Sequence, residues 1–433
     1  MKKLAVLAAG LLLSVSALAK ENIVMWHSMR GALEEKISQM VEDYNNSQDQ
    51  VHVEAIYQGT YEETIAKFKA VSGTKEAPEI VQMNDVSTAF MYRSGAITPM
   101  QDLIEKDETF DENKLEPALL NYYRIGGKLY SMPFNSSTSV LLYNKDAFRE
   151  AGLDPERPPR SYKEVAEYAA KLTKKDEAGV VDRYGFSMII YGWFIEQFLA
   201  NENTLYVNNE NGRTGELPTE VAYGEKLPMI LSWLGQMCKD GVANTYGRDF
   251  SATRSAFASG KIAMYMDSSA GISGVIRNAK FDSGAAYIPN ESGEFYGSVI
   301  GGGSLWISNS ISEAKQNAAW DFVKYTVSKD VQADWAKSSG YFPVNKDSYD
   351  VPVLQEFMAS YPQFTVVVNE LKDSKLSYTT QGAILGVFPD VRDKIVQAME
   401  DVCEGKDAIK ASDAAVKASN RIISRFNRVN NKK

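Results

Sequence analysis

The sequence predicts an α/β fold built as two lobes. Near the N-terminus, segments with strand alternation and segments with helical periodicity follow one another as strand, helix, strand, helix and strand, which is how an open α/β sheet begins. A second α/β unit fills the middle of the chain. With 433 residues, the chain is too long for one ordinary hydrophobic core and long enough for two.

The first α/β unit is predicted from its hydrophobic pattern, in which two helices separate three strands. The expected elements are a strand at 22–26, a helix at 32–44, a strand at 51–56, a helix that carries Ile65, Phe68 and Val71, and a strand at 79–83. Ligands bind beyond the C-terminal ends of the strands in such sheets. The segments 27–28, 59–61 and 84–85 therefore become candidate binding loops.

The remainder of the chain continues the alternation of strands and helices. Pro158-Pro159 ends a loop before a helix that starts near Ser161, and a Ser suits the N-cap of a helix. The other expected elements are an extended segment at 128–144, helices at 146–151 and 223–239, a helix-to-strand segment at 257–266, a strand at 304–307, helices at 312–327 and 331–337, and a C-terminal helix from about 391. The segment 201–215 is rich in Asn, Gly and Glu, which predicts a surface loop.

The N-terminal segment has the three parts of a secretory signal. Lys2 and Lys3 form a basic start, residues 4–15 are apolar, and Ala17-Leu18-Ala19 has the small-residue pattern of a cleavage site. The apolar part is too short to span a bilayer. We therefore expect residues 1–19 to be a cleaved signal peptide and the mature chain to be a soluble periplasmic protein. No Cys lies at the cleavage site, so we do not expect a lipoprotein.

Charge and composition narrow the classes of partner. The formal net charge is −9, and an acidic surface argues against binding to nucleic acid or to anionic lipid. An anionic small ligand stays possible, because a local group of donors can dominate inside a cleft. Cys238 and Cys403 are the two cysteines, and the sequence leaves open whether they form a disulfide.

Catalytic and metal-binding patterns are missing from the sequence. His27 and His52 are the two histidines, and no H-E-x-x-H, C-x-x-C or G-x-S-x-G pattern is present. We therefore expect no catalytic residues, no metal site and no cofactor. An exported hydrolase that uses a pair of carboxylates stays open as the enzyme alternative, since 56 acidic residues allow many pairs.

Several motifs along the chain resemble one family of transport proteins. The segment 257–264 matches the pattern F-x-x-G-K-x-A-M, in which a helix ends at a Gly and a strand follows. Further similar segments lie at 26–29, 133–138, 143–148, 151–155, 300–306, 340–343 and 385–392. Together they identify the chain as resembling the family 1 extracellular solute-binding proteins of ABC transporters, most closely those members that bind sn-glycerol 3-phosphate.

The resemblance implies a fold, an activity and partners. The fold is a two-lobed periplasmic binding protein of type II-like architecture, with a mixed sheet flanked by helices in each lobe and the ligand cleft between them. It implies that residues 20–135 and about 300–345 form the first lobe, and that residues 136–299 and about 346–433 form the second. The expected partners are a phosphorylated polyol or sugar and the permease subunits of an ABC importer, and the chain is expected to act as a monomer without catalysis.

The resemblance also implies positions for the ligand contacts. These are Tyr61, Asp85, Ser137, Ser268, Gly302, Tyr341 and Arg392, with Tyr162 as a possible aromatic wall. Two of them depart from the glycerol-phosphate binders, since Asp85 replaces a longer Glu and Tyr162 replaces a Trp. The implied ligand is sn-glycerol 3-phosphate, a glycerophosphodiester or both.

The chemistry of these residues fits a polyol that carries one phosphate. The planar fork of Arg392 suits a phosphate, Gly302 lets backbone N–H groups approach an anion, and Asp85 can accept hydrogen bonds from hydroxyls. From the residues alone, plainer interpretations stay open: a surface ion pair for Arg392 and a packed aromatic for Tyr341. A neutral sugar or oligosaccharide is the alternative ligand, since several related proteins differ in substrate.

Overall fold

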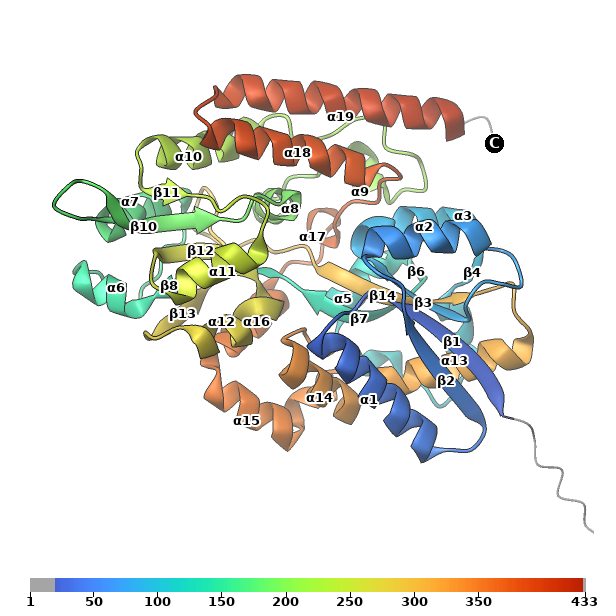
Figure 1. Ribbon diagram of the computed structural model, residues 1–433. Coiled ribbons are helices and arrows are strands. Elements are labelled where there is room, and N and C mark those ends of the chain that lie inside the picture. Colours follow the sequence, from blue (N-terminus) through green and yellow to red (C-terminus); the bar gives the residue numbers. More distant parts are fainter. Residues whose placement is uncertain (1–19, 431–433) are drawn as a thin grey trace, which may run out of the picture.

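The computed structural model describes residues 20–430, which form two lobes with a mixed β-sheet in each (Figure 1). The signal peptide predicted at residues 1–19 lies outside the described residues. The two-lobed α/β fold predicted from the sequence is confirmed. No helix within 20–430 is long and apolar enough to cross a membrane.

The sheet of the first lobe has the strand order β2-β1-β3-β14-β4, with β7 paired to β14. Its strands are β1 (Glu21–His27), β2 (Val51–Tyr57), β3 (Ile80–Asn84), β4 (Ile97–Thr98), β7 (Met132–Ser137) and β14 (Gly301–Ser308). Strands β1, β2 and β3 run parallel, and β14 runs antiparallel to β3. The parallel strands β1 and β3 therefore end on the same edge, where Asn84 ends β3 and Asp85 follows it.

The sheet of the second lobe has the order β11-β10-β12-β8-β13, with β9 paired to β10. Its strands are β8 (Ser139–Asn144), β9 (Lys174–Lys175), β10 (Val181–Met188), β11 (Ala243–Asn244), β12 (Ile262–Ser268) and β13 (Ser283–Ala286). The short strands β5 (Arg124–Ile125) and β6 (Lys128–Leu129) pair with each other outside both sheets. The predicted lobe boundaries themselves stay a prediction. The strands of the second sheet, β8 to β13, lie in sequence between β7 and β14 of the first sheet.

Helices cover the faces of both sheets. In chain order they are α1 (Ala32–Ser47), α2 (Tyr61–Val71), α3 (Thr88–Ser94), α4 (Met100–Ile104), α5 (Pro117–Tyr123), α6 (Lys145–Glu150), α7 (Tyr162–Leu172), α8 (Gly192–Asn201), α9 (Asn208–Gly212), α10 (Lys226–Lys239), α11 (Phe250–Ala258), α12 (Ile272–Asn278), α13 (Glu313–Thr326), α14 (Lys329–Ser339), α15 (Pro352–Ser360), α16 (Pro362–Asp373), α17 (Tyr378–Gln381), α18 (Phe388–Cys403) and α19 (Ala408–Asn430). The C-terminal pair α18 and α19 packs on α10 of the second lobe (Figure 1).

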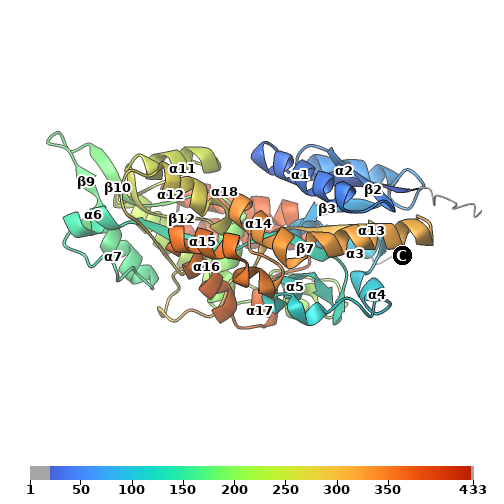
Figure 2. The ribbon, with the colours of Figure 1, turned by 90° about the horizontal axis from the view of Figure 1, so that it is seen from below.

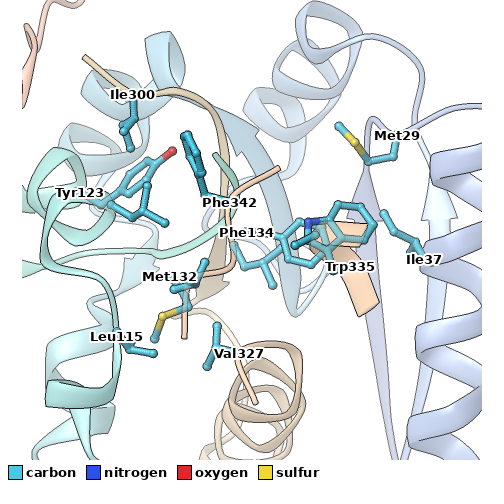
Figure 3. Packing of buried hydrophobic residues seen from close by; sticks show 14 of the residues in the cluster. Met29, Ile37, Leu115, Tyr123, Met132, Phe134, Ile300, Val327, Trp335 and Phe342 are labelled. Carbon is cyan, nitrogen blue, oxygen red and sulfur yellow. The ribbon is translucent and has the colours of Figure 1, made fainter. Parts of the chain in front are cut away.

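The two lobes share part of their buried interior. The chain passes from β7 to β8 through Thr138, and α14 to α17 lie between the two lobes when the molecule is seen from below (Figure 2). One apolar cluster joins side chains of both sheets, with Phe134 stacked on Trp335 at 4.8 Å between ring centroids (Figure 3). The two lobes therefore share a closely packed apolar interior.

The prediction of a surface loop at 201–215 is wrong. Five of its side chains, Asn201, Tyr206, Val207, Asn211 and Arg213, are buried, and part of the segment forms α9. The Arg213 guanidinium donates hydrogen bonds to four backbone carbonyl oxygens, in segments that belong to α5 and to α17 and their ends. The polar composition that suggested exposure therefore serves hydrogen bonds inside the protein.

The cysteines lie together on the C-terminal side of the second lobe. Cys238 in α10 and Cys403 in α18 are free thiols in this structure, and their Sγ atoms are 2.9 Å apart. Packing of α18 against α10 thus brings together two residues whose spacing in the sequence carried no geometric information.

Candidate ligand-binding site

A cavity of about 320 Å³ lies where the edges of the two sheets face each other. We call it the central cavity. Its lining residues come from both lobes: Leu33, Tyr61, Asn84, Asp85, Asn135, Ser137, Gly301, Gly302, Ser339 and Tyr341 on one side, and Tyr191, Trp193, Phe250, Arg254, Ser268 and Ala270 on the other. A larger hollow of about 760 Å³ beside β13 and α16 contains none of the predicted site residues. Six of the seven predicted ligand contacts, all except Arg392, line the central cavity.

Asp85 reaches the cavity because it directly follows β3. The strand is buried at Ile80–Met83, so the chain must leave the sheet at its C-terminal edge, and a short 3₁₀ turn at Asp85–Ser87 follows. Asp85 is 6% exposed. Burial raises the pKa of its carboxyl group, and the nearby Arg392 guanidinium opposes that rise.

The neighbouring loops place Tyr61 and Gly302 at the same edge. Tyr61 begins α2 directly after the N-cap Thr60, which forms a capping box with Glu63. Its hydroxyl accepts a hydrogen bond from Asn135 Nδ2 at 3.0 Å. Gly302 has a φ of +114°, and a Cβ there would overlap the carbonyl oxygen of Asn135. A glycine is therefore required for β14 to approach β7 this closely.

Ser137 and Ser268 meet across the two sheets. Ser137 ends β7 in the first sheet and Ser268 ends β12 in the second, and Ser268 Oγ donates to Ser137 Oγ at 3.0 Å. Tyr341 follows Gly340, whose left-handed conformation ends α14, and its ring stacks on Trp335 at 6.2 Å. These contacts bring groups from distant parts of the sequence into one polar cavity.

Tyr162 does not line the cavity, so the aromatic wall predicted there is corrected. Its side chain is 5% exposed and packs in the core of the second lobe, with its ring 4.8 Å from Trp233 and 5.7 Å from Phe198. Tyr162 is the first residue of α7, after the N-cap Ser161 that the sequence predicted. The helix turns this face toward the core, which excludes the ring from the cleft.

Arg392 lies behind the cavity and not in its lining, which is a second correction. Its guanidinium forms a bidentate ion pair with Glu196, with Nε to Oε1 at 2.7 Å and Nη2 to Oε2 at 2.9 Å. Nη2 also lies 3.5 Å from Asp85 Oδ2, and Nη1 lies 3.4 Å from the Tyr191 hydroxyl. Glu196 thus occupies the planar fork that the sequence assigned to a phosphate.

We call Arg392, Glu196 and Asp85 the buried triad. With two carboxylates and one guanidinium, it carries one net negative charge when all three groups are ionised. Burial raises the pKa of Glu196 to about 6, although Arg392 acts in the opposite direction. The triad therefore offers a ligand the carboxylate of Asp85, a hydrogen-bond acceptor for hydroxyl groups, and no free cationic fork.

The cation that lines the cavity is Arg254 in α11, which the sequence prediction missed. Its Nε and Nη2 each donate to the fully buried Asp267 at 2.9 Å. Asp267 therefore leaves Nη1 unused, and the Arg254 side chain remains 34% exposed. No sequence signal marked it, because a single Arg in a helix before Phe257 has the pattern of a solvated surface residue.

Trp193 is a second lining residue that the sequence prediction missed. It is 4% exposed, and its Nε1 donor has no hydrogen-bond partner among residues 20–430. The indole ring fills the space that a side chain at Gly301 would need. Within residues 20–430, no group of three His, Cys, Asp or Glu side chains could hold a metal ion. The arrangement therefore offers hydroxyls, one carboxylate, one guanidinium and aromatic rings for a small polar ligand.

Comparisons with known proteins show the family of the chain. Residues 39–366 match the family model described as "Bacterial extracellular solute-binding protein". The chain is 32% identical to the sn-glycerol-3-phosphate-binding periplasmic protein UgpB of Pectobacterium atrosepticum, over 96% of this chain and 94% of that protein. It is also 32% identical to UgpB of Escherichia coli K12, over 97% and 96% of the two chains.

Solved structures of similar fold come from binding proteins with different ligands. UgpB from Mycobacterium tuberculosis in complex with glycerophosphocholine has a TM-score of 0.78 at 21% identity, with 94% of this chain and 100% of that chain covered. The cyclic α-maltosyl-1,6-maltose binding protein from Arthrobacter globiformis has a TM-score of 0.77 at 22% identity, with the same coverage. At these identities the likeness concerns the fold alone.

Proposed function

The chain belongs to the bacterial extracellular solute-binding proteins, and from this premise we propose that it captures sn-glycerol 3-phosphate or glycerophosphodiesters in its central cavity. It then delivers them, as a periplasmic monomer, to the permease of an ABC importer. Support comes from relatives that are 32% identical over nearly their whole length and are named for sn-glycerol 3-phosphate.

One observation carries the proposal: the central cavity contains both a carboxylate for hydroxyl groups and a guanidinium for a phosphate. Asp85 and Arg254 line the same cavity from opposite lobes. The hydroxyls of Ser137, Ser268 and Tyr341 add neutral donors and acceptors between them. A ligand with a polyol end and an anionic end satisfies both groups, and contacts to both lobes would favour closure of the cleft.

The lining of the central cavity supports binding without catalysis. It contains no His, Cys or Lys side chain and a single carboxylate, Asp85, so it offers neither a histidine base nor the pair of carboxylates that glycosidases use. His27 lies buried in β1 and outside the lining, and burial lowers its pKa to about 4. We therefore propose a role in transport and no turnover of the ligand.

A neutral sugar is the second candidate ligand, and the buried triad favours it. Its net negative charge opposes an anion nearby, and the aromatic side chains of Tyr191, Trp193 and Phe250 line the cavity. Aromatic faces and a carboxylate together suit a carbohydrate. Several solved relatives of this fold are sugar-binding proteins, including one bound to maltotriose.

A panel of ligands separates the two candidates. We expect sn-glycerol 3-phosphate or glycerophosphocholine to raise the melting temperature of the purified mature protein, and maltose to leave it unchanged. A ligand at about 100 times its Kd stabilises the fold by about 2.7 kcal/mol, which thermal denaturation detects. Stabilisation by sugars alone would reject the phosphate ligands in favour of the second candidate. Calorimetric titration would then give the affinity of the ligand that binds.

A further inference from the structure

A second hollow of about 800 Å³ adjoins the central cavity. We call it the outer groove. It lies between α11, α12 and the end of α14, and it is lined by Ser251, Arg254, Ser255, Ala258, Ser259, Ala270, Gly271, Ser273, Gly274, Val275, Arg277, Asn278, Lys280, Phe281, Ser338 and Ser339. Arg254, Ala270 and Ser339 line both hollows. One ligand can therefore extend from the central cavity past Arg254 into the outer groove.

The outer groove has an unusual chemical composition for this protein. Its lining includes six serines and three cationic side chains and contains no Asp or Glu, although the chain as a whole carries a net charge of −9. Within residues 20–430, Arg277 and Lys280 are exposed and have no carboxylate within 4.0 Å. Both cations are therefore available to an anionic or hydroxylated ligand.

The wall of the outer groove contains a buried hydroxyl. Ser273 lines the outer groove from α12, is 6% exposed, and its Oγ has no hydrogen-bond partner within the described residues. Buried hydroxyls normally have partners, because an unpaired one costs free energy. Beside the central cavity, Trp193 Nε1 is likewise buried and has no hydrogen-bond partner within the described residues.

We propose that the outer groove holds the alcohol part of a glycerophosphodiester, and that the chain prefers diesters whose alcohol is an uncharged polyol. This inference rests on the proposed function. The glycerol part occupies the central cavity near Asp85, the phosphodiester lies against Arg254 at the junction, and the polyol contacts the serines of the outer groove. A quaternary ammonium group is disfavoured, because Arg277 and Lys280 repel it and the groove lining contains a single aromatic ring, Phe281.

Calorimetric titration with three probes tests this preference. The probes are glycerophosphoinositol, glycerophosphocholine and sn-glycerol 3-phosphate, and we expect the inositol diester to bind about tenfold more tightly than the choline diester at low salt. The double variant Arg277→Glu and Lys280→Glu should reverse the order of the two diesters. It should leave the affinity for sn-glycerol 3-phosphate within about twofold, which also shows that the variant is folded.

A matched control changes the same charge elsewhere. Lys410 and Arg425 are exposed on α19 and line neither hollow, so Lys410→Glu with Arg425→Glu should keep the parental order of ligands. If all three probes bind and the groove variant behaves like this control, the inference is overturned and the proposed function stands. If none of the three probes binds, the proposed function fails and the inference fails with it.

Discussion

Two arginines flank the same cavity under very different conditions. Arg392 is 8% exposed, and its fork is closed by Glu196 with Asp85 beside it. Arg254 is partly exposed and holds Asp267 with one edge of its guanidinium. A guanidinium can donate five hydrogen bonds, so its use depends on how many donors the protein itself consumes. The comparison indicates that Arg392 orients Asp85, whereas Arg254 is free to contact ligand.

The largest expected difference between the two arginines is in stability. Arg392→Ala should lower the free energy of unfolding by about 3–5 kcal/mol, because it leaves the buried carboxylates of Glu196 and Asp85 without a counter-charge. Arg254→Ala should lower it by about 1–3 kcal/mol, since Asp267 keeps hydrogen bonds from Tyr265 Oη and the Ser268 N–H. Urea denaturation without ligand measures both values, and equal losses would contradict the comparison.

The next effect is on ligand affinity. Arg254→Ala should weaken binding of a phosphate-bearing ligand by about 1.5–3 kcal/mol, the range for hydrogen bonds to a charged group. Arg254→Lys should recover part of this loss, since it keeps the charge and loses the planar fork. Calorimetric titration at constant salt gives the three values. If Arg254→Ala binds the ligand with the parental affinity, Arg254 is not part of the site, and Arg392 becomes the candidate contact for the phosphate.

The buried triad should also show itself in the pH dependence of stability. Burial raises the pKa of Glu196 in the folded state to about 6 from its usual value of 4.5. Its contribution to stability is therefore fully present below pH 4.5 and is lost as the pH rises through about 6. Glu196→Gln should remove this share of the decline, which denaturation curves of the variant and the parent between pH 4.5 and 7 can detect. An unchanged slope would argue against the raised pKa.

Glu370 provides the matched control for that measurement. Burial in α16 raises its pKa to about 8, and its Oε1 accepts a hydrogen bond from Ser298 Oγ at 2.6 Å. By the same sign, its contribution declines from pH 4.5 up to about pH 8, so it overlaps the decline of Glu196 up to about pH 6 and continues alone above that. Glu370→Gln should therefore flatten the stability profile at higher pH, while the Glu196 variant keeps that part of the decline.

The smallest expected effect concerns the direct contact between the two lobes. Ser268→Ala removes the hydrogen bond to Ser137 and an acceptor for the Ala270 N–H. We expect a loss of about 0.5–1.5 kcal/mol in the free energy of unfolding, well below the effect of Arg392→Ala. Urea denaturation checks this value. A loss as large as that of Arg392→Ala would make the serine pair, and not the buried triad, the main polar link at the cavity.

Local sequence patterns were enough to predict most of the fold. Strand alternation and strand order placed Asp85 beyond the end of β3, and the cap at Ser161 was found where its helix begins. The family motifs placed six of the seven predicted contacts around one cavity. The role of these six residues in binding stays a prediction. Each of them lies at the end of a strand or helix, or in a loop beside one, that the local sequence specifies.

Tertiary contacts decided what the sequence pattern left open. Arg392 and Glu196 are 196 residues apart, and their pairing depends on how α18 meets α8. The same kind of packing buried Tyr162 and the segment around Arg213, and it left Arg254 facing the cavity. The sequence by itself determined the elements and their buried faces, because periodicity is a local property. Only the tertiary structure determined which charges meet, because ion pairing depends on distances between segments that are remote along the chain.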